Sequence, residues 1–308
     1  MISSSALSRN IEVKREELLS YDSDSATLKR YYKQALGVKN TNIWLFGPPG
    51  VGKSKLVNSI FKSLHGSFEI ETAAVSGSKN AHITKDLKYI PLSTLGRSGG
   101  RPGNIFLVDA WGNDDTNYNE ALFESILKGK VVNNAQMNER PSKKISDVED
   151  KNKQVHAIVF VITAASCSEK SDCASLMKYY HLAVENHLYP IVVVTKVDNV
   201  SEDLKQHPEC MDNDEEVTNA ISALCSNTGI EIDSVYPIRN LSVDIQKERN
   251  DFIVLRCLEI LDAALLAADR FFEYQCVFEW RLNKINQESV LPTVANKVIH
   301  LNAKYLGH

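Results

Sequence analysis

A glycine-rich segment that ends in lysine and serine carries the strongest chemical signal in the sequence. Residues 47–54 read GPPGVGKS and match the pattern G-x-x-x-x-G-K-S. In this pattern backbone N–H groups wrap phosphates, the lysine reaches the outer two phosphates, and the serine hydroxyl ligates a magnesium ion. The pattern predicts a nucleotide phosphate site whose residues are Gly47, Pro48, Pro49, Gly50, Val51, Gly52, Lys53, Ser54 and Lys55. Lys53 is the predicted catalytic cation, and Ser54 is a predicted ligand of Mg²⁺.

A second candidate reads DAWG over residues 109–112, directly after the apolar run at 105–108. Open parallel sheets bind ligands at the carboxyl ends of their strands. We expect Asp109 to hold the magnesium ion through a water, and the N–H of Gly112 to contact a terminal phosphate. A D-x-x-G pattern is common, and it would indicate only a turn at the end of a strand if the glycine-rich segment were absent.

A third candidate, TKVD at 195–198, again ends an apolar run. The carboxylate of Asp198 can accept hydrogen bonds from the N1–H and N2–H₂ groups of guanine, which adenine does not offer. The stem of Lys196 can pack along the ring. With Thr195 these residues predict GTP and GDP as the ligands.

A weaker candidate lies after the last apolar run, where a backbone N–H of Arg239 or Asn240 can meet the guanine O6. Asn240 also fits a loop residue that makes its own turn.

The elements that must position these residues follow from the apolar pattern. Buried strands are expected at 43–46, 87–92, 105–108, 155–162, 191–194 and 235–238, and helices at 10–36 in two pieces, 55–64, 176–188, 217–225 and 252–275. Strands that alternate with helices predict an α/β fold, with a mostly parallel sheet and helices on both faces. The strands at 87–92 and 105–108, joined by a glycine-rich turn, predict an antiparallel hairpin at one edge.

Three regions are predicted along the chain: a helical lead-in at 1–40, a nucleotide domain at 41–276, and a helical tail at 277–308. Residues 133–154 are polar and charged, and are expected to form a surface insertion.

The order of these segments resembles a GTP-binding domain of the small-GTPase type, the G-domain fold of P-loop NTPases. Residues 40–276 also resemble the interferon-induced protein 44 family. This resemblance rests on GPPGVGKSKLVNSIF, VSGSKNAHITKDLKYI, ALFESILKGKV, VVVTKVDNV, GIEIDSVYPIRNLSVD and LRCLEILDAALLAADRFFE. It implies a cytoplasmic guanine-nucleotide-binding protein linked to innate or antiviral responses. Relatives typically place a TLDc domain ahead of the G domain, for which these 308 residues leave no room.

Four further residues bear on hydrolysis. The hydroxyl of Thr84 is a candidate third magnesium ligand, which would make residues 76–85 a switch loop, although a threonine in a polar loop needs no such role. Asn113 directly follows the D-x-x-G segment, where the small-GTPase pattern has a glutamine that orients the attacking water. Because the asparagine amide is shorter, slow turnover is expected. Arg97 and Arg101 are weak candidates for an arginine finger.

Three functions are compatible with these patterns: a slow GTPase, a non-catalytic guanine-nucleotide-dependent module that acts through a homodimer or an effector protein, and a P-loop ATPase. The third is suggested by the Gly-Pro-Pro-Gly start of the loop. It is disfavoured because Asp109 is followed by Ala110, whereas an ATPase of that kind would have an acidic pair at the end of the strand.

Composition limits the remaining classes. With 35 basic and 39 acidic side chains the net charge is -4, so no nucleic-acid partner is predicted. No segment has eighteen uninterrupted apolar residues, so no transmembrane segment is predicted. Six scattered cysteines fit free thiols in a reducing compartment, which is consistent with a cytoplasmic location.

Overall fold

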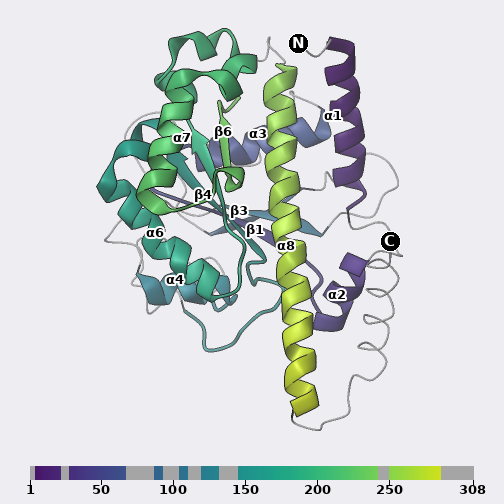
Figure 1. Cartoon of the computed structure of the whole chain (residues 1–308). Coiled ribbons are helices and arrows are strands. Elements are labelled where there is room, and N and C mark those ends of the chain that lie inside the picture. The colour runs from purple at the N-terminus through teal and green to yellow at the C-terminus, as the bar shows by residue number, and fades with distance from the viewer. Residues whose placement is uncertain are drawn as a thin grey trace.

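A computed structural model of the chain describes residues 4–21, 28–66, 87–92, 104–109, 119–131, 145–241 and 250–285 (Figure 1). Its centre is a six-stranded sheet in the order β2-β3-β1-β4-β5-β6. The strands are β1 (Thr41–Phe46), β2 (Lys88–Pro91), β3 (Ile105–Asp109), β4 (Ala157–Thr163), β5 (Ile191–Thr195) and β6 (Val235–Ile238). All neighbouring strands are parallel except β2 and β3. The predicted parallel sheet and the predicted edge hairpin are therefore confirmed.

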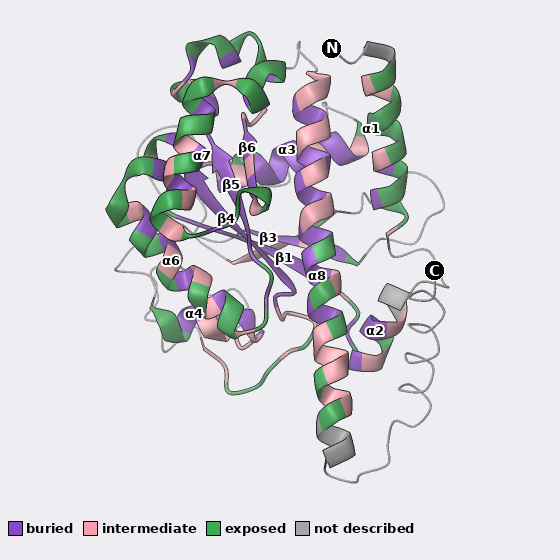
Figure 2. Ribbon diagram, in the orientation of Figure 1, coloured by how far each residue is buried: buried purple, intermediate pink, exposed green. Residues whose placement is uncertain are grey.

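The central strands are buried on both faces. Every residue of β1 and β5 is buried, and β4 is buried up to its last residue (Figure 2). Such strands need apolar side chains at consecutive positions, which explains why these runs are continuous and do not alternate. The strand register pairs Leu45 of β1 with Asp109 of β3, and Thr163 of β4 with Thr195 of β5. The ends of β1, β3, β4 and β5 consequently meet at one edge of the sheet.

Helices cover both faces of the sheet (Figure 1). On one face α3 (Lys53–His65) and the long α8 (Asp251–Ile285) pack together, and α1 (Ser4–Leu19) and α2 (Leu28–Leu36) lie against α8. On the other face α4 (Glu120–Leu127), α6 (Lys170–Glu185) and α7 (Glu215–Thr228) lie side by side. None of the described helices is long and apolar enough to cross a membrane.

An aromatic cluster forms the core beneath α4 and α6. The ring of Phe46 lies 4.9 Å from Phe123 and 5.6 Å from Phe160, both in edge-to-face geometry, and 4.9 Å from Tyr179. Edge-to-face pairs contribute about 0.5–1.5 kcal/mol beyond the burial of their area. Since Phe46 directly precedes the glycine-rich segment, this packing fixes the point from which that segment leaves the sheet.

Polar contacts bind the N-terminal helix α1 to α3 and α8. Arg15 Nε donates to the Ser63 carbonyl of α3 at 2.6 Å, and Lys14 forms an ion pair with Asp262 of α8 at 2.7 Å. These contacts join the predicted lead-in to helices of the nucleotide domain.

Several boundaries differ from the expected ones. α6 begins at Lys170 and not at 176, because residues 170–175 are mostly polar and Cys173 is the one buried residue among them. α8 continues to Ile285, so the division expected after residue 276 falls inside a helix. Two 3-10 helices, η3 (Glu202–Lys205) and η4 (Pro208–Asn213), lie between β5 and α7, where no helix was expected.

The expected surface insertion is described only from residue 145 onward, and that part is attached to the sheet. The Asn42 side-chain amide donates to the carbonyls of Asn152 at 2.9 Å and Gln154 at 2.7 Å. Residues 133–144 lie outside the described residues.

Candidate functional site

The glycine-rich segment forms a tight turn between β1 and α3, at the carboxyl edge of the sheet. A Cβ atom on Gly47 would lie 2.2 Å from the Val161 carbonyl oxygen, so no larger residue fits there. Gly52 has a left-handed φ of 101° directly before α3, a conformation that favours glycine. Gly47 thus allows the backbone to pass close to β4. Gly52 allows the chain to enter α3 directly, so that the first N–H groups of the helix are available to bind an anion.

Lys53 lies across this turn. Its Nζ donates to the carbonyls of Gly47 at 2.8 Å and Pro48 at 2.9 Å, and the residue is 7% exposed. Burial lowers the pKa of Lys53 to about 8, and the nearby Asp109 carboxylate opposes this shift. A buried ammonium group at a helix N-terminus is a strong attractor for phosphate, because both the charge and the helix dipole favour an anion.

The predicted magnesium ligands Ser54 and Asp109 are brought together. Ser54 Oγ donates to Asp109 Oδ2 at 2.9 Å, and Asp109 is 1% exposed at the end of β3. A hydroxyl and a carboxylate are hard oxygen donors of the type that Mg²⁺ prefers. The donor set therefore fits a magnesium ion next to the lysine.

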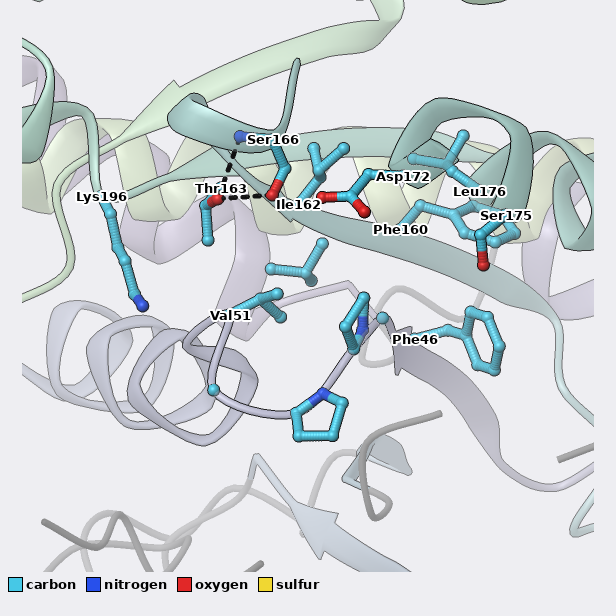
Figure 3. A pocket seen from close by; sticks show the side chains of 15 residues that line it. Phe46, Val51, Phe160, Ile162, Thr163, Ser166, Asp172, Ser175, Leu176 and Lys196 are labelled. Atoms are coloured by element: carbon cyan, nitrogen blue, oxygen red, sulfur yellow. Dashed lines mark hydrogen bonds between the residues drawn. The ribbon is translucent and has the colours of Figure 1, made fainter. Parts of the chain in front are cut away.

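The residues after β5 form the second part of the site. Lys196 is exposed and has a left-handed φ of 55°, and a short 3-10 helix, η2 (Val197–Asn199), follows it. A non-glycine residue in this conformation costs about 1–2 kcal/mol. In Figure 3 the Lys196 side chain extends toward the loop that carries Val51. Asp198 lies on η2 and is half-buried.

The hydroxyl of Thr195 contacts two backbone carbonyls. It lies 2.6 Å from the Val51 carbonyl oxygen and 3.2 Å from that of Ile162, and the residue is fully buried. The threonine therefore fastens the glycine-rich turn to the end of β5.

Arg239 and Asn240 follow β6 and differ in what they contact. Arg239 Nη1 donates to the carbonyls of Leu204 at 3.2 Å and Lys205 at 2.5 Å, so its guanidinium binds η3. Only the backbone of this residue is then left for the predicted contact with a base. Asn240 Nδ2 donates to the Gly52 carbonyl at 3.3 Å, which joins the β6 loop to the phosphate turn.

A cavity of about 290 Å³ lies beside the phosphate turn, on its β4 side (Figure 3). It is lined by Gly47–Val51, by the end of β4, and by polar side chains of η1 (Ala164–Ser168) and α6 that include Ser166 and Asp172. Thr163 Oγ1 donates to Ser166 Oγ at 2.9 Å and accepts from the Ser166 N–H at 3.3 Å. Polar side chains of β4, η1 and α6 therefore line the cavity beside the phosphate turn, and none of them was a candidate residue.

Thr163 could have been found from the sequence, because it ends an apolar run in the same way as Asp109 and Thr195. Ser59 was also missed. Its hydroxyl accepts from the Leu241 N–H at 3.0 Å, a second link between the β6 loop and α3. A buried serine on an amphipathic helix gives no signal of such a contact.

Several predicted residues lie outside the described part of the chain. They are Thr84, Gly112 and Asn113, together with the finger candidates Arg97 and Arg101. The described part thus brings together the phosphate turn, Ser54, Asp109 and Lys196, and it places Asp198 on η2 after β5; Thr84 and Asn113 are not among the described residues.

A curated relative and two solved structures resemble the chain. Human interferon-induced protein 44-like is 26% identical over 260 residues, which cover 80% of this chain and 56% of the relative. The chain thus spans about half the length of the curated relative it matches. A probable GTP-binding protein engB is 16% identical with a TM-score of 0.41, over 75% of this chain and 99% of that structure.

The translation elongation factor SelB from Methanococcus maripaludis, in complex with the GTP analogue GPPNHP, is 17% identical with a TM-score of 0.38, over 74% of this chain and 34% of that structure. At such low TM-scores the two structural likenesses carry no argument about this chain.

The family match covers the phosphate turn, Asp109 and the first two residues of the TKVD segment, and it ends before Asp198. The model described as "50S ribosome-binding GTPase" matches residues 42–196, which is just over half of the 308 residues. The same range contains strands β1 to β5 of the parallel sheet. The chain therefore belongs to this family of GTPases and carries its guanine-nucleotide-binding G domain.

Proposed function

We propose that the protein binds GTP and GDP with Mg²⁺ at the site built by the phosphate turn, and that it hydrolyses GTP slowly. The observation that carries this proposal is the arrangement at one sheet edge. The buried Lys53 ammonium lies across the turn, next to the Ser54–Asp109 pair. Family membership supports the nucleotide, and the residue roles are inferred from chemistry and position.

The phosphate end of the nucleotide is assigned to residues 47–55. Lys53 neutralises phosphate charge, and the N–H groups at the start of α3 donate hydrogen bonds to the phosphate oxygens. Ser54 and Asp109, with Thr84 as a third ligand proposed from the sequence, would hold a magnesium ion that neutralises charge on the phosphates. Gly112 is assigned an N–H contact to the terminal phosphate.

The base end is assigned to the segments after β5 and β6. Asp198 accepts from the N1–H and N2–H₂ groups of guanine, and the Lys196 stem covers the ring. Backbone N–H groups of residues 239–240 face the guanine O6. Thr195 and the Asn240 side chain act as positioning residues, since their polar groups contact Val51 and Gly52 of the phosphate turn.

Slow hydrolysis follows from the residue after D-x-x-G. Asn113 carries a shorter amide than the glutamine of the small-GTPase pattern, and positioning of the attacking water supplies much of the rate in such enzymes. The same observation favours a second candidate function, a non-catalytic module in which residues 76–85 report the bound nucleotide to a homodimer partner or an effector protein.

The organisation of the chain is part of the proposal. Residues 41–276 form the nucleotide domain, with 1–40 as a lead-in and 277–308 as a tail whose first residues continue α8 to Ile285. The contacts of α1 with α3 and α8 support an integral lead-in. The cytoplasmic location and the role in innate responses stay predictions from the family resemblance.

Titration calorimetry with GDP, a non-hydrolysable GTP analogue and ADP, each with and without magnesium, tests the binding proposal. We expect guanine nucleotides to bind, ADP not to bind, and magnesium to strengthen binding of the GTP analogue. Equal affinity for ADP would contradict the role of Asp198.

A phosphate-release assay on the same preparation separates the two candidate functions. Slow release that is lost in Lys53→Ala supports the GTPase. Guanine binding with no release above the level of that variant supports the non-catalytic module.

A further inference from the structure

A second concave surface lies at the opposite edge of the sheet. A groove of about 620 Å³ is formed by the end of α6, the chain entering β5 and β6, and one side of α8. Its lining includes Tyr189, Pro190 and Ile191 at the start of β5, whereas the nucleotide site is at the carboxyl end of that strand. Because the strands are parallel, a partner in this groove would leave the nucleotide site open.

Large apolar side chains gather around the groove. Val184, Tyr189 and Leu266 line it, Ile232 lies between the lining residues Glu231 and Asp233, and Phe278 stacks on the lining residue Tyr274. Each of these five apolar residues is at least 40% exposed, and they are five of the eight exposed large apolar residues in the described part of the chain. An apolar patch of this kind is typical of a protein–protein contact.

A row of rings forms a ridge beside the groove. The His187 ring stacks on Tyr274 at 4.3 Å, and Tyr274 stacks on Phe278 at 6.1 Å. His187 has a left-handed φ of 64° just after α6, where glycine is the favoured residue. Histidine at this strained position supplies the ring that begins the ridge.

The two walls of the groove carry opposite charges. Arg270 of α8 is exposed on one wall, with its guanidinium 5.8 Å from the centre of the Tyr189 ring. Glu231 and Asp233 are exposed on the other wall, beside η5 (Ile232–Ser234). None of these three residues forms an ion pair with another described residue within 4.0 Å.

We propose that this surface joins two copies of the chain about a two-fold axis. In a two-fold contact the same patch serves both copies, so Arg270 of each copy can face Glu231 and Asp233 of the other. The aromatic ridge of each copy can fill the groove of the other. Other occupants would fit this surface less well. A basic peptide segment would lie beside the like charge of Arg270, and an acidic one would lie beside the carboxylates of Glu231 and Asp233. A small ligand would leave Ile232 and Phe278 exposed.

The test is the oligomeric state of the full chain, measured by sedimentation velocity over a series from low micromolar to near-millimolar concentration. We expect a concentration-dependent dimer both without nucleotide and with GDP. Arg270→Glu should weaken the dimer at least about tenfold, as expected for close charge pairs at an interface. The triple variant with Arg270→Glu, Glu231→Arg and Asp233→Arg should restore it, because both charges are exchanged.

Arg281→Glu is the matched control, since Arg281 is exposed on the same helix and does not line the groove. Leu266→Asp provides a second probe that does not depend on charge pairing and should also weaken the dimer. Circular dichroism melting and GDP binding verify that each variant is folded. A monomer at every concentration, a dimer that forms only with nucleotide, or a dimer insensitive to both Arg270→Glu and Leu266→Asp would overturn the proposal.

Discussion

The two halves of the nucleotide site are built differently. In the phosphate half, polar groups are buried and bound to one another: Lys53 to the turn carbonyls, and Ser54 to Asp109. In the base half, Lys196 is exposed and Asp198 is half-buried on a short 3-10 helix. From this difference we expect the phosphate half to supply most of the affinity through buried charge, and the base half to supply selectivity.

The strongest test of this comparison is Lys53→Ala. We expect loss of at least about 100-fold in GDP affinity, since two hydrogen bonds to a charged group contribute about 1.5–3 kcal/mol each. Titration calorimetry measures the affinity. Lys62→Ala, further along α3, is the control and should bind normally. Unchanged affinity in Lys53→Ala would remove the phosphate role of this residue.

The second test concerns the base half. Asp198→Asn should weaken GDP binding by about 10-fold to 100-fold, the loss expected for hydrogen bonds to a charged group. It should also improve binding of xanthosine diphosphate, whose C2 carbonyl can accept from the new amide. Competition binding measures the ratio, and Asp203→Asn on η3 is the control. Full guanine selectivity in Asp198→Asn would show that another group reads the base.

The third test uses pH. Burial lowers the pKa of Lys53 to about 8, so this lysine loses its proton in the unliganded protein as pH rises above 8. Phosphate favours the charged form, so GDP affinity should be constant below pH 8 and fall by up to about tenfold per pH unit above it. Calorimetry in two buffers of different ionisation enthalpy should detect proton uptake.

The lowered pKa of Lys53 has the opposite effect on the free energy of unfolding, which should rise with pH. Between pH 8 and the unfolded value of 10.5, the unfolded chain keeps a proton that the folded lysine has released. The unliganded protein should therefore gain stability across this window, in the absence of other titrations. A GDP affinity that does not change from pH 7 to 9.5 would contradict the assignment of Lys53.

The smallest effect is expected from Asn240→Ala, which removes one bond between the two halves. At 3.3 Å this hydrogen bond to Gly52 is long, and the loss of one neutral hydrogen bond of about 0.5–1 kcal/mol corresponds to roughly a twofold to fivefold loss of GDP affinity. Asn227→Ala, which removes a similar amide–carbonyl bond on α7, is the control. A loss as large as that of Asp198→Asn would indicate direct contact with the nucleotide.

The sheet and the backbone of the site were predictable because their signals are local. The continuous apolar runs predicted the strands, and the glycine pattern predicted the phosphate turn. The antiparallel edge followed from the glycine-rich turn before residue 105. Polar segments were less predictable: the start of α6 and the two 3-10 helices before α7 each have only one or two buried residues among polar ones.

The partners of individual side chains were not predictable in the same way. The sequence placed Arg239 beside Asn240, and the fold turns the first toward Leu204 and the second toward Gly52. It placed Thr195 before Lys196, and the fold uses its hydroxyl to hold Val51. Each contact depends on which backbone carbonyl lies nearby in space, and the partners are 35 to 188 residues apart along the chain.

The sequence by itself determined which strands carry the candidate residues: the glycine-rich turn follows β1, an acid ends β3, and the carboxylate proposed to read the base follows β5. These follow from local turn geometry and from the burial of apolar runs. Tertiary structure decided which of these groups share hydrogen bonds, and it created the groove between α6 and α8. Helices and strand ends distant in sequence form that surface, and only packing brings them together.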